Sequence, residues 1–261
     1  MFSEQVKKTI EKLRAAGRVI TNVYSMDVLK SSEVFISDEH AILLAHNDHG
    51  VERLYYYAHS LQDIKYLLTN LPAKEFVLEY LTKNPDECAV VLHNMGFKCI
   101  AKMMRVSAKD FLFKAQESGV SQFFNESIGV FANIKQAHEI NSLLWETFDN
   151  RISHLLNNEE IEGAIKNREI TVHLNEQNNI DAIQFIKIQP KKLYINHSYN
   201  KADKSVIHAM LQNRMKEFSK MGGNYVYCWV DCNNIASRKY LGKYGMQHDG
   251  MWNMVYSLKR D

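Results

Sequence analysis

The stretch Asn234-Ile235-Ala236-Ser237-Arg238-Lys239-Tyr240-Leu241-Gly242-Lys243-Tyr244-Gly245-Met246 says most about the fold of this chain. It predicts a helix from Ile235 to Tyr244 that ends at Gly245, because glycine readily takes the left-handed conformation at a helix C-terminus. The alternation of side chains before it predicts a strand from Tyr225 to Val230. A second strand is expected from Met251 to Leu258, so the local order is strand, helix, strand.

The rest of the second half continues this pattern of helices and strands. Hydrophobic spacing and turn residues predict the elements upstream of it. They are helices over Ile134 to Phe148 and Asn158 to Lys166, strands over Arg168 to Leu174, Ile180 to Ile188 and Leu193 to His197, and a helix from about Asp203 to Met221.

The first half has a shorter version of the same order, with a hairpin turn at Asn47-Asp48-His49-Gly50 and a helix that ends at Gly96-Phe97. We therefore predict an α/β (α+β) protein of two units, each a mixed, mostly antiparallel sheet flanked by helices. The expected domains are residues 1–115 and 128–261, and three prolines and eleven glycines leave little room for a flexible linker.

Composition excludes several classes of protein. The chain has 261 residues, 46% of them hydrophobic and 24% charged, which is ordinary for a soluble globular protein. Residues 1–130 carry a net charge of −1 (15 basic, 16 acidic) and residues 131–261 one of +3 (17 basic, 14 acidic). Since nucleic-acid binding depends on neutralising phosphates, we expect no nucleic-acid partner, although a small anionic ligand of the second half stays open.

No apolar stretch reaches the roughly 18 residues of a membrane span, and the first residues lack an apolar signal core, so we expect no membrane partner and a cytoplasmic location. The four cysteines lie in apolar or strand-like segments, which favours buried thiols in a reducing compartment. Cys228 and Cys232 lack a matching second pair of ligands, so we expect no metal site.

The stretch from Asn234 to Met246 resembles the last conserved helix of the GNAT N-acetyltransferase superfamily, which commonly reads Asn-x-Ala-Ser-x-x-x-Leu-x-Lys-x-Gly-Phe. Six positions fit, and Met246 stands in place of the Phe. The element order of residues 133–258 is also similar to that fold. Leu92-His93-Asn94-Met95-Gly96-Phe97 looks like a worn copy of the Gly-Phe ending, so the resemblance implies a tandem protein with a degenerate N-terminal half.

The resemblance implies an N-acyltransferase that moves an acyl group, most often acetyl, from acetyl-CoA as co-substrate to an amine. In that case the strand Leu193 to His197 steadies the thioester, and the helix starting near Asp203 offers its N-terminal N–H groups and dipole to the diphosphate. Asn234 would hydrogen-bond the pantetheine arm. The implied cofactor-binding residues are Ile195, Lys201, Lys204, Ser205, Asn234, Ser237 and Lys243.

One loop departs from the family pattern. The family places glycines before the diphosphate-binding helix, whereas Asn200-Lys201-Ala202-Asp203-Lys204-Ser205 contains none. Asp203 would repel a phosphate, while Lys201 and Lys204 would attract it. This leaves two alternatives open: another acyl donor, such as an acyl-carrier protein or an aminoacyl-tRNA, or a non-catalytic GNAT-like binding protein.

Three side chains are candidates for proton transfer. His197, at the end of the donor strand, is a candidate base because the unperturbed pKa of a histidine suits that role, and its alternative is a surface histidine. Asp231, where the strand Tyr225 to Val230 ends, is a candidate for holding the amine, and its alternative is a capping or turn aspartate. Leu241 stands where the family often has a tyrosine acid. Tyr240 is about 100° round the helix and is expected to face elsewhere, which leaves the proton to water.

Fewer features of the sequence bear on the acceptor and the partners. The row Tyr225, Tyr227 and Trp229 predicts either one wall of an acceptor pocket or buried sheet core. We expect a small-molecule or peptide amine as substrate, and a homodimer stays open.

Overall fold

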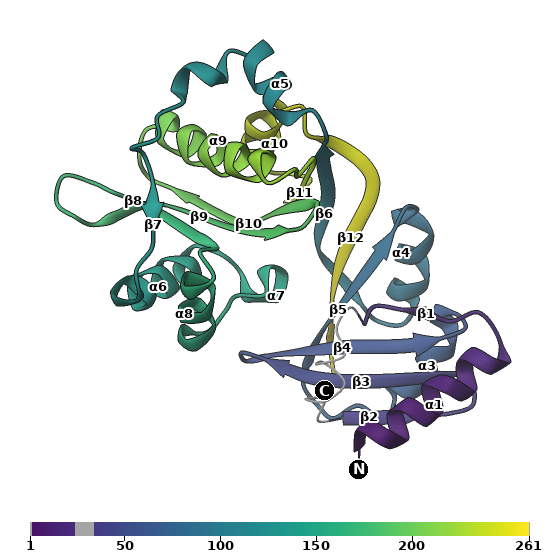
Figure 1. Cartoon of the computed structure of the whole chain (residues 1–261). Helices are drawn as coiled ribbons and strands as arrows, with labels where there is room; N and C mark the ends of the chain where they lie inside the picture. The colour runs from purple at the N-terminus through teal and green to yellow at the C-terminus, as the bar shows by residue number, and fades with distance from the viewer. Residues whose placement is uncertain (1, 24–33, 261) are drawn as a thin grey trace. The chain divides into compact units, whose positions relative to one another are not determined.

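The computed structural model describes residues 2–23 and 34–260, which divide into two compact units. The first unit contains residues 1–103 and 251–261, and the second contains residues 104–250 (Figure 1). Two strands, β6 (Lys98–Ala108) and β12 (Gln247–Lys259), have residues in both units. None of the helices among the described residues is long and apolar enough to cross a membrane.

In the first unit the sheet has the strand order β2-β3-β4-β5-β12, and β1 pairs with β4. The β4–β5 pair is parallel, and β2–β3, β3–β4 and β5–β12 are antiparallel. The elements are α1 (Phe2–Ala16), β1 (Ile20–Thr21), β2 (Val34–Ser37), β3 (Ala41–Asp48), β4 (Val51–Ala58), η1 (Leu61–Asp63), α3 (Ile64–Leu68), β5 (Glu75–Thr82) and α4 (Pro85–Asn94).

The predicted hairpin turn joins β3 to β4 and is confirmed. His49 and Gly50 both have positive φ, 49° and 89°, as a two-residue turn between twisted antiparallel strands requires. The backbone N–H of Gly50 donates to Oδ1 of Asn47 at 2.9 Å, which closes the turn. The two faces of the sheet carry different helices: α1 packs Val6, Ile10 and Leu13 on one face, and the cluster that includes α3 and α4 covers the other.

The second unit has the strand order β6-β11-β10-β9-β8-β7. The pairs β7–β8, β8–β9 and β9–β10 are antiparallel, whereas β10–β11 is parallel. The elements are α5 (Phe111–Glu117), η2 (Val120–Phe123), β7 (Val130–Phe131), η3 (Ile134–Gln136), α6 (Ala137–Thr147), α7 (Asn150–Ser153), α8 (Asn158–Lys166), β8 (Ile170–Leu174), β9 (Ile180–Gln189), β10 (Lys192–Asn200), α9 (Lys204–Lys220), β11 (Tyr225–Asp231) and α10 (Ile235–Gly242).

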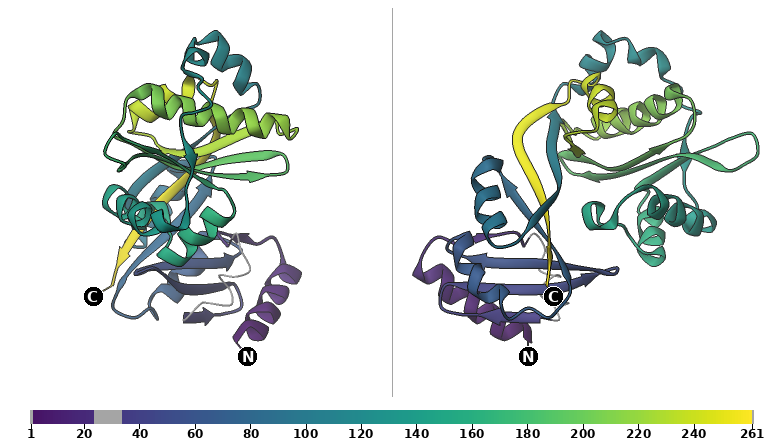
Figure 2. Two further views of the ribbon diagram at one scale, coloured as in Figure 1. Left: turned by 60° about the vertical axis from the view of Figure 1, so that its left-hand side comes forward. Right: turned by 180° about the vertical axis from the view of Figure 1, so that it is seen from behind.

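Helices cover both faces of the sheet in this second unit, as Figure 2 shows from two sides. Helices α6 and α8 pack on one face in a core that includes Phe185 and Tyr199. Helix α9 packs on the other face, where Val206, Ile207 and Met210 meet Ala182 of β9. The predicted fold class, a mixed sheet with flanking helices, is confirmed.

Both units follow one element order: three antiparallel strands, a helix, a parallel strand, a helix and a last strand. Each last strand contributes to the other unit's sheet. Strand β12 follows α10 of the second unit and pairs with β5 of the first, from Trp252–Thr82 to Lys259–Glu75. Strand β6 follows α4 and stands next to β11. The predicted bounds 1–115 and 128–261 follow the repeated element order along the sequence and stay a prediction. The compact units divide instead within β6 and β12.

Candidate functional site

The parallel pair β10–β11 of the second unit is irregular. Their parallel register runs only from Lys192–Tyr225 to Ile195–Cys228, although β10 continues to Asn200 and β11 to Asp231. At the same point β10 has a bulge against β9, between Ile195 and His197. The described ends of the two strands therefore lie in the interior of the sheet without a ladder between them. Backbone N–H and C=O groups there are open to an extended ligand.

Two turns follow these strands. Because β10 and β11 are parallel neighbours, the turn before α9 and the turn before α10 lie at the same edge of the sheet (Figure 1). The structure thus brings six predicted residues to this edge in two groups. They are Lys201, Lys204 and Ser205 in the first group, and Asp231, Asn234 and Ser237 in the second.

The turn before α9 is closed by its own side chain. Oδ1 of Asp203, the N-cap, accepts from the backbone N–H of Ser205 at 2.8 Å and from its hydroxyl at 2.6 Å. These hydrogen bonds hold the pKa of the Asp203 carboxyl below its ordinary value. The backbone N–H groups of Lys201 and Ala202 donate to the carbonyl of Asp181 at 2.7 and 3.3 Å. The N–H groups that a diphosphate would need are therefore largely used within the chain.

The turn before α10 is arranged differently. Oδ1 of Asp231 accepts from the backbone N–H of Asn233 at 2.7 Å, so this carboxylate acts in the turn, as the alternative reading expected. Oδ1 of Asn234 caps α10 by accepting from the N–H of Ser237 at 3.0 Å. Asn234 is exposed, and its amide nitrogen makes no hydrogen bond within the described residues. That N–H₂ group is available to an arm lying along the strands.

His197 is not at this edge. It is 6% exposed, packs edge-on to Phe148 at 5.0 Å between ring centroids, and its Nε2 lies 3.2 Å from the carbonyl oxygen of Ser153. Desolvation lowers its pKa to about 4. The surface-histidine alternative is therefore wrong. The side chain lies on the sheet face covered by α6 and α8, opposite Phe185 of β9.

Ile195, Tyr240 and Lys243 have separate places. Ile195 is buried at the last β10–β11 pair. The Tyr240 hydroxyl donates to the carbonyl of Ile207 on α9 at 3.0 Å, and burial raises the pKa of this phenol well above its ordinary value. Lys243 is exposed at the other end of α10 from Asn234, and its carbonyl accepts from the hydroxyl of Ser118 at 2.7 Å. Neither Tyr240 nor Lys243 joins the two groups at the sheet edge.

Sequence reasoning missed a set of buried polar side chains beneath α9. Nδ1 of His208 lies 2.8 Å from the hydroxyl of Tyr244, and desolvation lowers the pKa of His208 to about 4. Gln184 of β9 donates to the hydroxyl of Ser198 at 3.4 Å, beside the unpaired part of β10. A signal existed: His208 and Gln212 are polar at i and i+4 on the face of α9 that is otherwise apolar.

The aromatic row lies on one face of β11, as predicted. Tyr225, Tyr227 and Trp229 are half-buried, whereas the residues between them are buried. Tyr194 of β10 extends the row, since its ring stacks on that of Tyr227 with centroids 5.0 Å apart. The guanidinium of Arg105 lies 5.9 Å from the Trp229 ring. A role as the wall of an acceptor pocket stays a prediction.

Neither the protein-family models nor the curated protein sequences gave a match. Among solved structures, a tandem GNAT protein from the clavulanic acid biosynthesis pathway is similar over 99% of this chain and 94% of its own, with a TM-score of 0.60 at 8% identity. This likeness shows a tandem GNAT fold.

Two further structures agree on the fold. A GCN5-related N-acetyltransferase from Sphaerobacter thermophilus matches with a TM-score of 0.57 at 12% identity, over 92% of this chain and 87% of its own. A probable N-acyltransferase from Enterococcus faecalis matches with a TM-score of 0.54 at 10% identity, over 98% of this chain and 70% of its own.

Proposed function

We propose, from its GNAT fold, that the second unit transfers an acyl group from a thioester to the amine of a small molecule or peptide. The observation that carries this proposal is the early end of the β10–β11 ladder at the Ile195–Cys228 pair. A pantetheine arm is extended and rich in amides, so it fits an open strand edge in the middle of a sheet. An unpaired N–H of β10 is also suited to steady the charge that develops on the carbonyl oxygen.

Within this proposal the roles of the sheet-edge residues follow their positions. Asn234 binds the pantetheine arm through its available amide N–H₂ group. Asp231 holds the amine or passes the proton of the amine to water, since Asp231 stands at the end of β11. We assign no proton transfer to His197, because it is buried on the sheet face that α6 and α8 cover. Its pKa of about 4 also makes it a weak base.

Calorimetric titration with acetyl-CoA tests the donor. We expect saturable binding, and we expect Asn234→Ala to weaken it about tenfold, the effect of losing one well-placed hydrogen bond to the arm. Asn158→Ala is the matched control, because Asn158 is exposed at the start of α8 and should leave the affinity unchanged. A folded protein that binds no acetyl-CoA at millimolar concentration would rule this donor out.

The turn before α9 favours a second candidate donor. The Asp203 carboxylate and the internally used N–H groups do not fit the diphosphate of free CoA, whereas a pantetheine thioester on an acyl-carrier protein lacks the nucleotide. For this donor we expect acyl transfer from the carrier protein to exceed transfer from acetyl-CoA. If free CoA is the donor, transfer from acetyl-CoA exceeds transfer from the carrier protein. If neither donor supports transfer, the result favours a non-catalytic binding protein.

Asp203→Asn measures how much the carboxylate opposes a diphosphate. Asparagine caps a helix as well as aspartate does, so α9 should stay intact while one negative charge is removed. We expect the affinity for acetyl-CoA to rise about three- to tenfold, with a smaller gain at high salt. Glu176→Gln removes the same charge from an exposed turn and is the control. An unchanged affinity in Asp203→Asn would show that no phosphate approaches this turn.

A further inference from the structure

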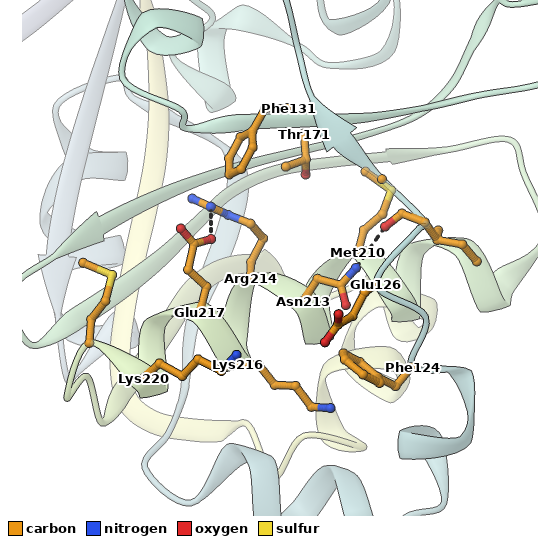
Figure 3. A pocket seen from close by; sticks show the side chains of 13 residues that line it. Phe124, Glu126, Phe131, Thr171, Met210, Asn213, Arg214, Lys216, Glu217 and Lys220 are labelled. Atoms are coloured by element: carbon orange, nitrogen blue, oxygen red, sulfur yellow. Dashed lines mark hydrogen bonds and ion pairs between the residues drawn. The ribbon is translucent and has the colours of Figure 1, made fainter.

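The second unit contains a pocket of about 520 Å³ that none of the predicted site residues lines. Its walls are the segment from Phe124 to Phe131, Thr171 of β8, and the part of α9 from Met210 to Met221 (Figure 3). The volume is within the range of small-molecule sites in proteins. Because its lining shares no residue with the sheet edge, the pocket is separate from the place where we propose that the thioester binds.

The wall opposite α9 is held in place by that helix. The side-chain amide nitrogen of Asn213 donates to the carbonyls of Asn125 and Ile128, both at 3.0 Å. Gly129 has a φ of 80°, and a Cβ atom there would come within 2.7 Å of Cγ of Met210. The chain thus approaches α9 as closely as only a glycine allows, so the pocket is preformed.

The charged side chains of the lining carry a small net positive charge. Arg214, Lys216 and Lys220 contribute three cations, against the carboxylates of Glu126 and Glu217. Glu217 pairs with Arg214. Within the described residues, no carboxylate lies within ion-pair distance of the ammonium group of Lys216 or of Lys220. Two lysines one turn apart on α9 therefore offer their positive charges to a ligand in the pocket.

Arg214 is the second sign of a missing partner. It is 5% exposed, its Nη2 donates to the carbonyl of Arg168 at 3.1 Å, and its Nε has no hydrogen-bond partner among the described residues. Burial lowers the pKa of this guanidinium. A buried cation whose donors are incompletely used costs stability, and an anion entering the pocket beside it offsets that cost.

Two aromatic rings also line the pocket. The ammonium nitrogen of Lys216 lies 2.9 Å from the centroid of Phe124, and the Arg214 guanidinium lies 4.9 Å from that of Phe131. The side chain of Met210 adds an apolar surface. Cations beside apolar rings are suited to a molecule that has both a negative group and an apolar body.

We propose that this pocket binds a small organic anion, a carboxylate or a phosphate attached to an apolar body. Its negative group is held by Lys216 and Lys220 and competes with Glu217 for Arg214. Its apolar body lies against Phe124, Phe131 and Met210. The proposal does not depend on acyl transfer, because none of these residues belongs to the sheet edge.

Calorimetry with three probes tests the proposal: phenyl phosphate, phenylacetate and the uncharged benzyl alcohol. We expect at least one anion to bind at millimolar concentration or below and benzyl alcohol to bind about tenfold more weakly. Whichever anion binds more tightly identifies the head group. If neither anion binds, or if the alcohol binds equally well, the proposal is wrong.

Variants locate the binding. Lys216→Ala/Lys220→Ala should weaken the anion about tenfold, while Glu217→Gln, which removes the competing carboxylate, should tighten it about threefold. Lys239→Ala on α10 removes an exposed lysine outside the pocket and should leave the affinity unchanged. Equal affinities in the wild type and the double-lysine variant would overturn the assignment, provided circular dichroism shows both to be folded.

Discussion

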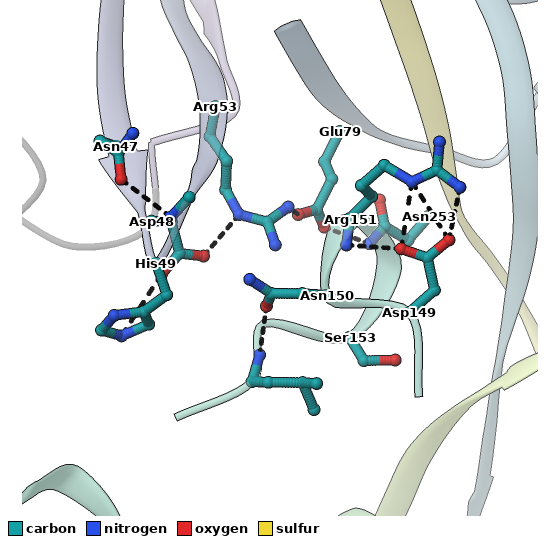
Figure 4. Close-up of polar contacts among 12 residues, drawn as sticks. Asn47, Asp48, His49, Arg53, Glu79, Asp149, Asn150, Arg151, Ser153 and Asn253 are labelled. Carbon is teal, nitrogen blue, oxygen red and sulfur yellow. Dashed lines mark hydrogen bonds and ion pairs between the residues drawn. The ribbon is translucent and has the colours of Figure 1, made fainter. Parts of the chain in front are cut away.

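Replacing Arg53 with methionine is expected to destabilise the first unit by about 3 to 5 kcal/mol. Arg53 is only 2% exposed, its Nε lies 2.5 Å from a carboxylate oxygen of Asp48, and its Nη1 lies 3.2 Å from one of Glu79 (Figure 4). Asn253 of β12 also donates to Glu79, at 2.5 Å. Methionine keeps much of the length of the side chain but leaves two largely buried carboxylates without this cation.

Urea denaturation of the wild type and of Arg53→Met measures the difference. Lys74→Met is the matched control, because Lys74 is half-exposed and its ion pair with Glu52, at 3.0 Å, should contribute no more than about 1 kcal/mol. A loss below about 1 kcal/mol in both variants would mean that Arg53 contributes no more than a surface ion pair does.

The second unit is expected to lose stability as the pH falls from about 6.5 to 4. Burial lowers the pKa of His197 to about 4 in the folded chain, whereas an unfolded histidine titrates near 6.5. Between these values the unfolded state binds a proton that the folded state does not, so protons favour unfolding. The loss from His197 reaches about 3 kcal/mol near pH 4. His208, whose pKa is also lowered to about 4 by desolvation, acts in the same direction.

His197→Gln isolates the part due to His197. Glutamine does not titrate, and its amide group can still reach the carbonyl of Ser153, which lies 3.2 Å from Nε2 in the wild type. We expect the fall in unfolding free energy between pH 6.5 and 4 to become clearly smaller in the variant. His138→Gln on α6, where the side chain is exposed, is the control and should keep the slope of the wild type. Equal slopes in the wild type and His197→Gln would contradict the prediction.

Local structure was predictable wherever one residue type dictates the backbone. The hairpin at Asn47 to Gly50 and the helix that α8 forms from Asn158 to Lys166 both depend on neighbours in the chain. The alternation along β11 was predictable for the same reason, because successive side chains of a strand point to opposite faces.

The site was predictable only in part, and His197 shows why. In a regular strand Ile195 and His197 would share a face, since they are two residues apart. The bulge between them places Ile195 opposite Ile186 and His197 opposite Phe185, which lie on different faces of the sheet. Nothing in the local sequence marks this bulge, so a candidate base at the site became a buried side chain of the α6 and α8 face.

By itself the sequence determined the repeated order of strands and helices and the motif that ends in Gly245, because periodicity, caps and glycines act over a few residues. Only the tertiary structure decided that β12 completes the sheet of the first unit, that β10 and β11 part after Ile195, and that α9 faces a cationic pocket. Each of these depends on pairing between segments far apart in the chain. Strand partners are selected by the edges that the whole fold leaves open, which no local pattern specifies.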